Sequence, residues 1–134
     1  MKTPTTIKTE IFHGATGGLP AKFLGALKMR EIPAAGQFNI SMLHVALPPR
    51  SSELAVTHAR TREFVFIIRG KAAGFLNGTR IPLKKGDYLV IPAGTRHRFE
   101  TGAQGVEALS IFAPPIDPAN PDAAVVLTRR ARKI

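Results

Sequence analysis

The chain has no cysteine among its 134 residues. A disulfide framework, a thiolate metal site and a cysteine nucleophile are therefore excluded, so a metal ion would need nitrogen and oxygen ligands. No apolar run approaches the roughly 20 residues that a membrane-spanning helix needs, and no apolar segment of a signal peptide follows the first residues. These absences predict a cytoplasmic protein that has no membrane partner.

Acidic residues are also scarce, since 9 Asp and Glu face 19 Lys and Arg and give a formal net charge of +10. A basic surface is the usual sign of nucleic-acid binding. However, aromatic residues do not alternate with the basic ones as a base-stacking surface requires, no helix-turn-helix or zinc-finger pattern is present, and several basic residues gather in 129–133. We therefore expect a mostly solvated basic surface and no nucleic-acid partner.

Short runs rich in β-branched and aromatic residues recur along the chain, separated by turn-forming residues. Asn77-Gly78 between two apolar runs is the strongest short-range signal for a β-hairpin. No segment has a sustained helical period with caps at both ends, so the pattern predicts an all-β fold. Strands are expected at 38–47, 63–69, 73–76, 79–83, 88–91, 98–101 and 106–113.

The regular strand pattern occupies residues 36–115, which we expect to form one barrel domain. In residues 1–35, glycines and prolines interrupt short apolar runs, and this pattern predicts additional edge strands. Residues 116–134 are expected to contain a proline-rich connector, a further strand at 123–127 and a basic tail.

Two blocks of sequence each carry a histidine beside a buried strand. In the second block, Gly86 begins a turn, 88–91 has the composition of a buried strand, Pro92-Ala93-Gly94 forms an exit turn and His97 follows. In the first block, His58 is followed by four residues and Glu63, and six further residues lead to Gly70. A strand bounded in this way can present an imidazole to a cavity.

These blocks resemble the paired motifs of the cupin family. The first family motif reads Gly, His-x-His, three or four residues, Glu, six residues, Gly, and the second reads Gly, five residues, Pro-x-Gly, two residues, His. The residues that match are Glu63, Gly70, Gly86, Pro92, Gly94 and His97, with His58 at the second histidine of the pair. The resemblance is close over 56–101 and looser over 36–115, and it implies an RmlC-like jelly roll, or double-stranded β-helix.

Two positions depart from the family pattern. Val56 stands where the first histidine of the pair is expected, and Thr101 replaces the asparagine that often closes the second motif. In another register His58 would be the first histidine, but Arg60 would then be the second and too few residues would precede Glu63. One expected metal ligand is missing in either register.

The resemblance implies that His58, Glu63 and His97 hold a divalent metal such as Fe, Mn, Ni or Zn. If 63–69 is a regular strand, Glu63, Val65, Ile67 and Arg69 share one face. A carboxylate on such an apolar face costs several kcal/mol unless it is paired or coordinated. The alternative is that Glu63 pairs with Arg60, Arg62 or Arg69 and that both histidines are ordinary polar side chains in the barrel.

His44 lies on the strand before the first motif, where it could supply the missing ligand or simply pack on an apolar face. Four arginines flank the motif histidines. One or two of them could face the cavity and bind a carboxylate or phosphate, although a solvent-facing position is the alternative for each. These arginines are Arg60, Arg62, Arg96 and Arg98.

Two functions agree with these features. The first is a metal-dependent enzyme, with the dioxygenase, isomerase or lyase chemistry of similar proteins, that acts on a small anionic molecule. The second is a ligand-binding or sensing cupin that has neither metal nor catalysis. We further expect a homodimer, because residues 64–68 are apolar on both faces and need cover on each side.

Overall fold

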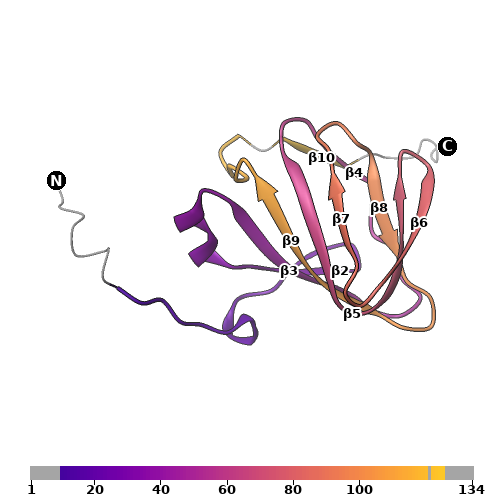
Figure 1. Ribbon diagram of the computed structural model, residues 1–134, viewed down its shortest axis with the longest axis horizontal. Coiled ribbons are helices and arrows are strands. Elements are labelled where there is room, and N and C mark those ends of the chain that lie inside the picture. The colour runs from indigo at the N-terminus through magenta and orange to yellow at the C-terminus, as the bar shows by residue number, and fades with distance from the viewer. Residues whose placement is uncertain (1–9, 121, 126–134) are drawn as a thin grey trace.

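The computed structural model describes residues 10–120 and 122–125, which form an almost purely β structure (Figure 1). Two short 3-10 helices, η2 (Thr16–Gly18) and η3 (Pro33–Phe38), lie within residues 10–38. No helix within these ranges has the length and apolar character to cross a membrane. The strands are β1 (Lys22–Leu24), β2 (Leu27–Glu31), β3 (Ser41–Leu47), β4 (Val56–His58), β5 (Arg62–Leu76), β6 (Thr79–Lys84), β7 (Tyr88–Ile91), β8 (His97–Glu100), β9 (Val106–Ala113) and β10 (Ala123–Val125).

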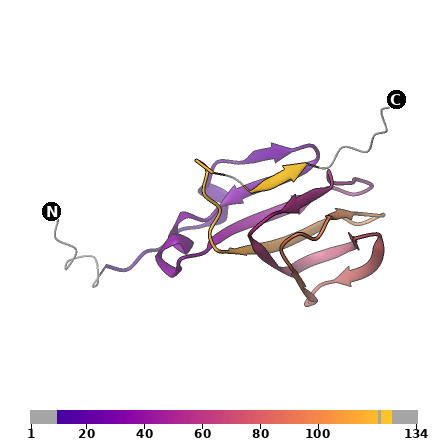
Figure 2. The ribbon, with the colours of Figure 1, turned by 90° about the horizontal axis from the view of Figure 1, so that it is seen from above.

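The strands form one antiparallel sheet that curls back on itself (Figures 1 and 2). Its hydrogen-bonded order is β1-β2-β3-β9-β5-β8-β4-β10, and β6 and β7 each also pair with β5. The first half of β5 pairs with β9 and β7, and its second half pairs with β6 and β8. Because β5 belongs to both layers, the fold is the jelly roll, or double-stranded β-helix, that the sequence predicts.

One turn and one position within β5 show why glycine is needed there. Asn77 and Gly78 have φ values of 48° and 86°, and the type I′ turn of a two-residue hairpin requires positive φ at both positions. The predicted hairpin is thus confirmed between β5 and β6. Gly70 has a φ of 84°, and a Cβ atom there would collide with the carbonyl oxygen of Gly105. Gly70 therefore lets β5 pass close to the start of β9.

The two strands expected at 63–69 and 73–76 are one continuous strand, β5. A register shift occurs between Ile67 and Arg69 along the pairing with β9, which is the sign of a β-bulge. The bulge moves Arg69 off the inner face, and its side chain is 77% exposed. The prediction that Arg69 shares a face with Glu63 is therefore wrong, because strict alternation ends at the bulge.

At the ends of the barrel, the additional N-terminal strands are confirmed as β1 and β2. The strand expected at 38–47 begins only at Ser41, because η3 extends to Phe38 and Asn39 adopts a left-handed conformation with a φ of 57°. The strand expected at 123–127 is present as β10, whereas its last two residues and the basic tail lie outside the described residues.

The hydrophobic core lies between the two layers. Its buried cluster consists of Val65, Ile67, Leu83, Ile91 and Ala108. Phe66 lies between Val65 and Ile67 on β5 and points to the opposite face. It is 39% exposed, and its cross-strand partner Tyr88 is 69% exposed. The apolar strand is therefore covered on its inner face by the second layer, while its outer face meets solvent.

Candidate metal centre

Three buried side chains converge from the ends of three strands. His58 is the last residue of β4, Glu63 is the second residue of β5 and His97 is the first residue of β8. One ligand atom of each residue lies within 4.8 Å of the others. The structure thus brings together the three residues that the motif spacing selects, although 39 positions separate the first from the last in the sequence.

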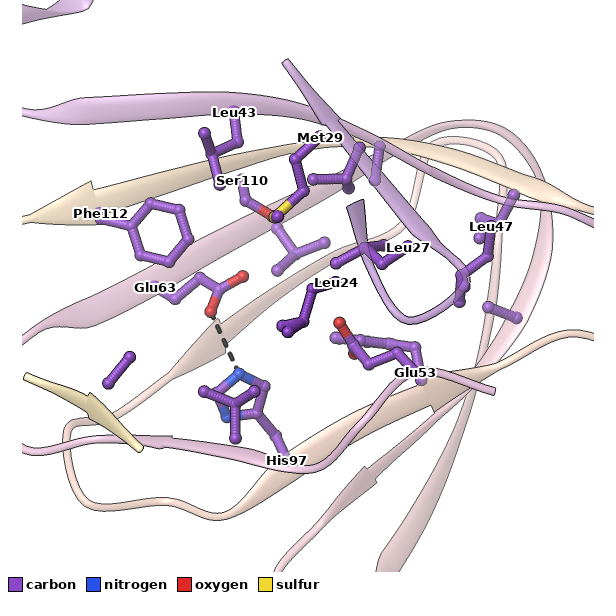
Figure 3. Close-up of a pocket in the computed structure, with 18 of the residues that line it drawn as sticks. Leu24, Leu27, Met29, Leu43, Leu47, Glu53, Glu63, His97, Ser110 and Phe112 are labelled. Atoms are coloured by element: carbon purple, nitrogen blue, oxygen red, sulfur yellow. Dashed lines mark ion pairs between the residues drawn. The ribbon is translucent and has the colours of Figure 1, made fainter. Parts of the chain in front are cut away.

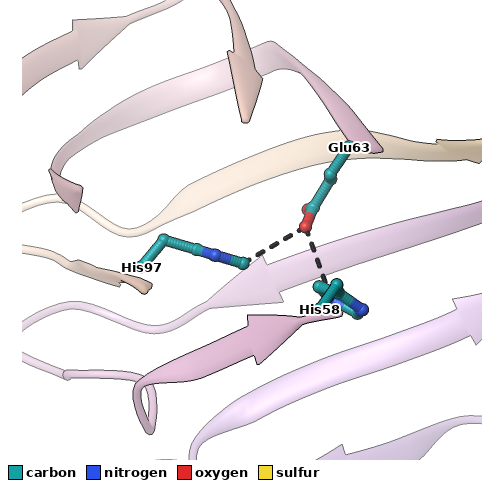
Figure 4. Close-up of side chains that lie close together, drawn as sticks. All are labelled: His58, Glu63 and His97. Atoms are coloured by element: carbon teal, nitrogen blue, oxygen red, sulfur yellow. Dashed lines mark ion pairs between the residues drawn. The ribbon is translucent and has the colours of Figure 1, made fainter. Parts of the chain in front are cut away.

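The carboxylate of Glu63 lies between the two imidazoles (Figure 4). Its Oε1 atom is 3.2 Å from His97 Nε2 and 3.8 Å from His58 Nε2. The two rings are stacked, with centroids 5.7 Å apart and planes inclined by 17°. Both Nε2 atoms therefore face the same carboxylate oxygen, which is the convergence that a shared cation requires.

The other ring nitrogens face outward from the cluster. Nδ1 of His97 lies 3.0 Å from the carbonyl oxygen of Thr95, so its N–H donates to that oxygen, and in the neutral ring Nε2 then carries the lone pair. Nδ1 of His58 is buried, and the nearest acid is Asp122, whose Oδ1 atom is 3.6 Å away. The predicted support of each histidine through its second nitrogen is thus confirmed for His97, whereas Nδ1 of His58 has no hydrogen-bond partner among the described residues.

Asp122 lies beside the cluster, and sequence reasoning missed it. It follows the proline-rich connector, and only the pairing of β10 with β4, in which Ala123 faces His58, brings it to the cluster. Its Oδ2 atom accepts hydrogen bonds from the backbone N–H groups of Arg60 and Thr61 at 2.6 and 2.8 Å. Burial opposes the charged carboxylate, but these hydrogen bonds outweigh it and lower the pKa of Asp122 to about 2.

The charge state of His97 depends on Glu63. Burial favours the neutral imidazole, but the hydrogen bond to Glu63 and the negative charge of that carboxylate together raise the pKa of His97 above its ordinary value. In the charged form, Nε2 of His97 carries a proton toward Glu63, and a cation that binds to Nε2 must displace it. Metal binding should therefore release protons and weaken at low pH.

This donor set fits a divalent metal ion. Two imidazole nitrogens and one carboxylate oxygen form a facial set that leaves coordination positions open, and they suit Fe, Mn, Ni or Zn. The alternative in which Glu63 pairs with an arginine does not occur among the described residues. Arg60 donates to the carbonyl oxygen of Asn120, Arg62 is exposed, and Arg69 pairs with Glu107.

The other proposed ligand, His44, is not brought to the cluster. It lies on the outer face of β3, where its Nε2 atom is 2.7 Å from Glu107 Oε2. Val56, in contrast, is buried and lines the same cavity as His58, two residues away on β4. The position of the missing family histidine thus faces the cluster, and an apolar side chain occupies it.

The cluster opens onto a cavity of about 230 Å³ (Figure 3). Aliphatic and aromatic side chains form most of its wall, and the additional strands β1 and β2 contribute Leu24, Leu27 and Met29. The remaining polar groups at the wall are few, chiefly Ser110 and a second carboxyl group, that of Glu53. Sequence reasoning did not identify Glu53, because it belongs to neither motif.

None of the four arginines considered from the sequence lines this cavity. Arg62 and Arg96 are exposed, and the hydrogen bond from Arg60 lies at the surface. Arg98 pairs with Glu100 at 2.7 Å and lies over the ring of Phe75. In the described part of the chain, the cavity therefore has no arginine that would bind an anion.

Comparison with known proteins agrees with the motif pattern and the fold. The family profile described as Cupin domain matches residues 43–112, which include all three residues of the cluster. The chain belongs to the cupin family. An uncharacterised protein of Aquifex aeolicus (strain VF5) is 29% identical over 91 residues, which cover 68% of this cupin and 69% of the relative.

A germin-like protein of Oryza sativa subsp. japonica is 29% identical over 110 residues, which cover 77% of this cupin. The match covers 51% of that relative, so this cupin spans about half of its length.

Two solved structures with similar folds are enzymes. The polyketide cyclase RemF from Streptomyces resistomycificus superposes with a TM-score of 0.71 at 17% identity, over 88% of this chain and 87% of its own. The nucleoside dehydratase Pac13 from Streptomyces has a TM-score of 0.69 at 15% identity, over 87% of this chain and 92% of its own. A variant of Pac13 has been solved with uridine. At these identities the likeness concerns the fold alone.

Proposed function

We propose that this cupin is a metal-dependent enzyme that acts on a small molecule inside the barrel. The observation that carries this proposal is the buried cluster of His58, Glu63 and His97 at a mostly apolar cavity. A divalent Fe, Mn, Ni or Zn ion held by these residues would supply a Lewis acid for a substrate oxygen.

The surrounding residues define what such a substrate must be. Glu63 carries the negative charge at the cluster, and the carbonyl of Thr95 keeps His97 in the orientation that presents Nε2. The apolar wall excludes water and favours a hydrophobic body. We therefore propose that an anionic oxygen of the substrate binds at the cluster, and that its apolar remainder fills the cavity without help from an arginine.

The reaction classes that fit are those predicted from the family resemblance, namely dioxygenase, isomerase or lyase chemistry. Support comes from two enzymes that have this fold. RemF is a polyketide cyclase and Pac13 is a nucleoside dehydratase. The alternative is a ligand-binding or sensing cupin without catalysis. Val56 favours this alternative, because it leaves the cluster one histidine short of the family pattern.

An untargeted conversion experiment distinguishes the two functions. Wild-type protein loaded with each of the four metals is incubated with a metabolite extract, and Glu63→Gln protein treated in the same way serves as control. We expect a compound that wild type consumes and the variant does not. A compound that remains bound to wild type in native mass spectrometry, yet is never converted, would support the sensing function instead.

We also propose that the protein is a cytoplasmic homodimer, with the outer face of β5 and β7 at the interface. Phe66 and Tyr88, which are directly opposite each other on these strands, are exposed there together with Val90. Light scattering should give twice the chain mass of 14.4 kDa. The monomer mass at micromolar concentration would contradict the dimer.

A further inference from the structure

Glu53 is a second acidic residue at the cavity, and the loop that carries it is held in place. Its backbone N–H donates to the carbonyl oxygen of Phe99 on β8 at 2.9 Å. Two residues earlier, the backbone N–H of Ser51 donates to Thr101 Oγ1 at 3.0 Å, and the same hydroxyl donates to the carbonyl oxygen of Pro48. Thr101, which replaces the family asparagine, thus anchors the loop from which Glu53 enters the cavity.

The protein satisfies only part of the hydrogen-bonding capacity of the Glu53 carboxyl group, which has a backbone hydrogen bond with Phe99. Its Oε1 atom is buried and has no hydrogen-bond partner among the described residues. No hydrogen bond or ion pair in that part of the chain joins its side chain to His58, Glu63 or His97. In Figure 3 its carboxyl group lies among the lining side chains, with Leu24 between it and Glu63 in this view.

A buried carboxyl oxygen without a partner is unfavourable for folding, and it is far more so when the group is charged. Burial raises the pKa of Glu53 to about 8, and the negative charge of Glu63 acts in the same direction. The charges of His97 and Arg98 and the backbone hydrogen bond with Phe99 act in the opposite direction but do not outweigh burial. At neutral pH the group is therefore a carboxylic acid. It offers an O–H donor to whatever molecule occupies the cavity.

We propose that Glu53 is a substrate-binding residue, which donates a hydrogen bond from its neutral carboxyl group to a carbonyl or hydroxyl oxygen of the molecule in the cavity. This inference rests on the proposed function and adds a substrate class to it. The substrate has one oxygen for the cluster, a second oxygen for Glu53 and an apolar body between them. At about 230 Å³ the cavity is smaller than the roughly 300–1,000 Å³ of drug-sized sites, so the molecule is small.

The test uses metal-free protein and two fluorinated probes that differ in one group. 4-Fluoroacetophenone has a carbonyl acceptor, whereas 4-fluorotoluene has none, and their affinities are compared by ¹⁹F NMR. We expect wild type at about pH 6 to prefer the ketone by about 2- to 10-fold, the size of one hydrogen bond. Glu53→Met should lose this preference, and Glu53→Gln should keep it because an amide N–H also donates.

The pH dependence separates hydrogen bonding from a structural role. At about pH 10, above the pKa near 8, wild type should lose its preference for the ketone while Glu53→Gln retains it. The matched control is Glu100→Gln on β8, whose carboxylate pairs with Arg98 outside the cavity and should behave as wild type. Thermal unfolding of Glu53→Met should be no easier than that of wild type, because the substitution removes a buried carboxyl oxygen that has no partner among the described residues.

The proposal is overturned if wild type and Glu53→Met show the same ketone preference, if the wild-type preference is unchanged between the two pH values, or if neither probe binds to wild type. Because the probes are measured without metal, these results do not depend on the cluster. Mn(II) binding to the same variants is measured separately, and its absence in wild type would contradict the proposed function without deciding the role of Glu53.

Discussion

Two pairs of histidine and glutamate lie on opposite faces of the same sheet. On the inner face, His97 and Glu63 are 3.2 Å apart, and their side chains are 5% and 8% exposed. On the outer face, His44 and Glu107 are closer, at 2.7 Å, but their side chains are 14% and 28% exposed. The pairs thus consist of the same residue types and differ in burial and surroundings.

The surroundings decide what each pair can do. Glu107 is also 3.3 Å from Arg69, so the charge of the outer carboxylate is already compensated, and no second histidine approaches it among the described residues. Among the residues that the structure describes, the inner carboxylate faces two imidazoles and no arginine. A short contact alone therefore does not identify a metal site, whereas several donors converging in a buried space do.

Removal of an inner ligand should have the largest effect. His97→Ala deletes one of the two nitrogen donors, and we expect the affinity for Mn(II) to fall by more than about 100-fold, beyond the loss typical of an outer-shell change. Isothermal titration calorimetry measures the affinity for Mn(II) in both proteins. The matched control is His44→Ala on the outer face, which should bind metal as wild type does, and equal losses in the two variants would remove the distinction between the faces.

The comparison can be sharpened by adding a donor to the inner face. Val56 lines the cavity two residues from His58, so Val56→His should supply the missing family ligand. We expect metal affinity to rise by at least about tenfold, which is about 1.4 kcal/mol. Val56→Leu, which keeps the site apolar, should show no gain. A folded Val56→His protein that binds no more tightly than wild type would refute the motif register.

Removal of the acidic group beside His58 should have a smaller effect on metal binding. Asp122→Asn removes the negative charge near His58 Nδ1, and we expect about tenfold weaker metal binding. The pKa of Asp122 is lowered from 3.8 to about 2 in the folded protein, so its stabilising contribution is complete above about pH 4 and is lost as the pH falls toward 2. Urea unfolding across this range should therefore show a steeper loss of stability in wild type than in Asp122→Asn.

The smallest effect is expected on the outer face. His44→Gln replaces one member of a partly exposed ion pair, so the free energy of unfolding should change by no more than about 1 kcal/mol. Metal affinity should change less than about twofold, because the outer pair shares no partner with the cluster among the described residues. A larger loss of metal binding would show that the outer pair is coupled to the cluster.

Much of the fold was predictable because its signals are local. Asn77-Gly78 specifies the hairpin, and the run at 88–91 gives the bounds of β7. The bulge after Ile67 was not predictable, since it depends on how β5 pairs with β9 and not on the residue types in β5 alone.

The site likewise contains residues that local sequence signals predict and residues that only long-range contacts bring in. The motif spacing selects His58, Glu63 and His97, whose ligand atoms the structure places together. Asp122 and Glu53 carry no signal of their own, because each reaches the site through a long-range contact, one by pairing of β10 with β4 and the other by a loop bonded to β8. The arginines illustrate the converse, since closeness in sequence to a ligand did not place them in the cavity.

The most direct test of the central claim is a comparison of two isosteric variants, Glu63→Gln inside the barrel and Glu107→Gln outside it. Titration of metal-free protein with Mn(II), Fe(II), Ni(II) and Zn(II) should show one saturable site per chain in wild type and in Glu107→Gln. Glu63→Gln should lose that site while remaining folded. Wild type that binds none of the four metals, or metal binding that is equal in both variants, would contradict the account.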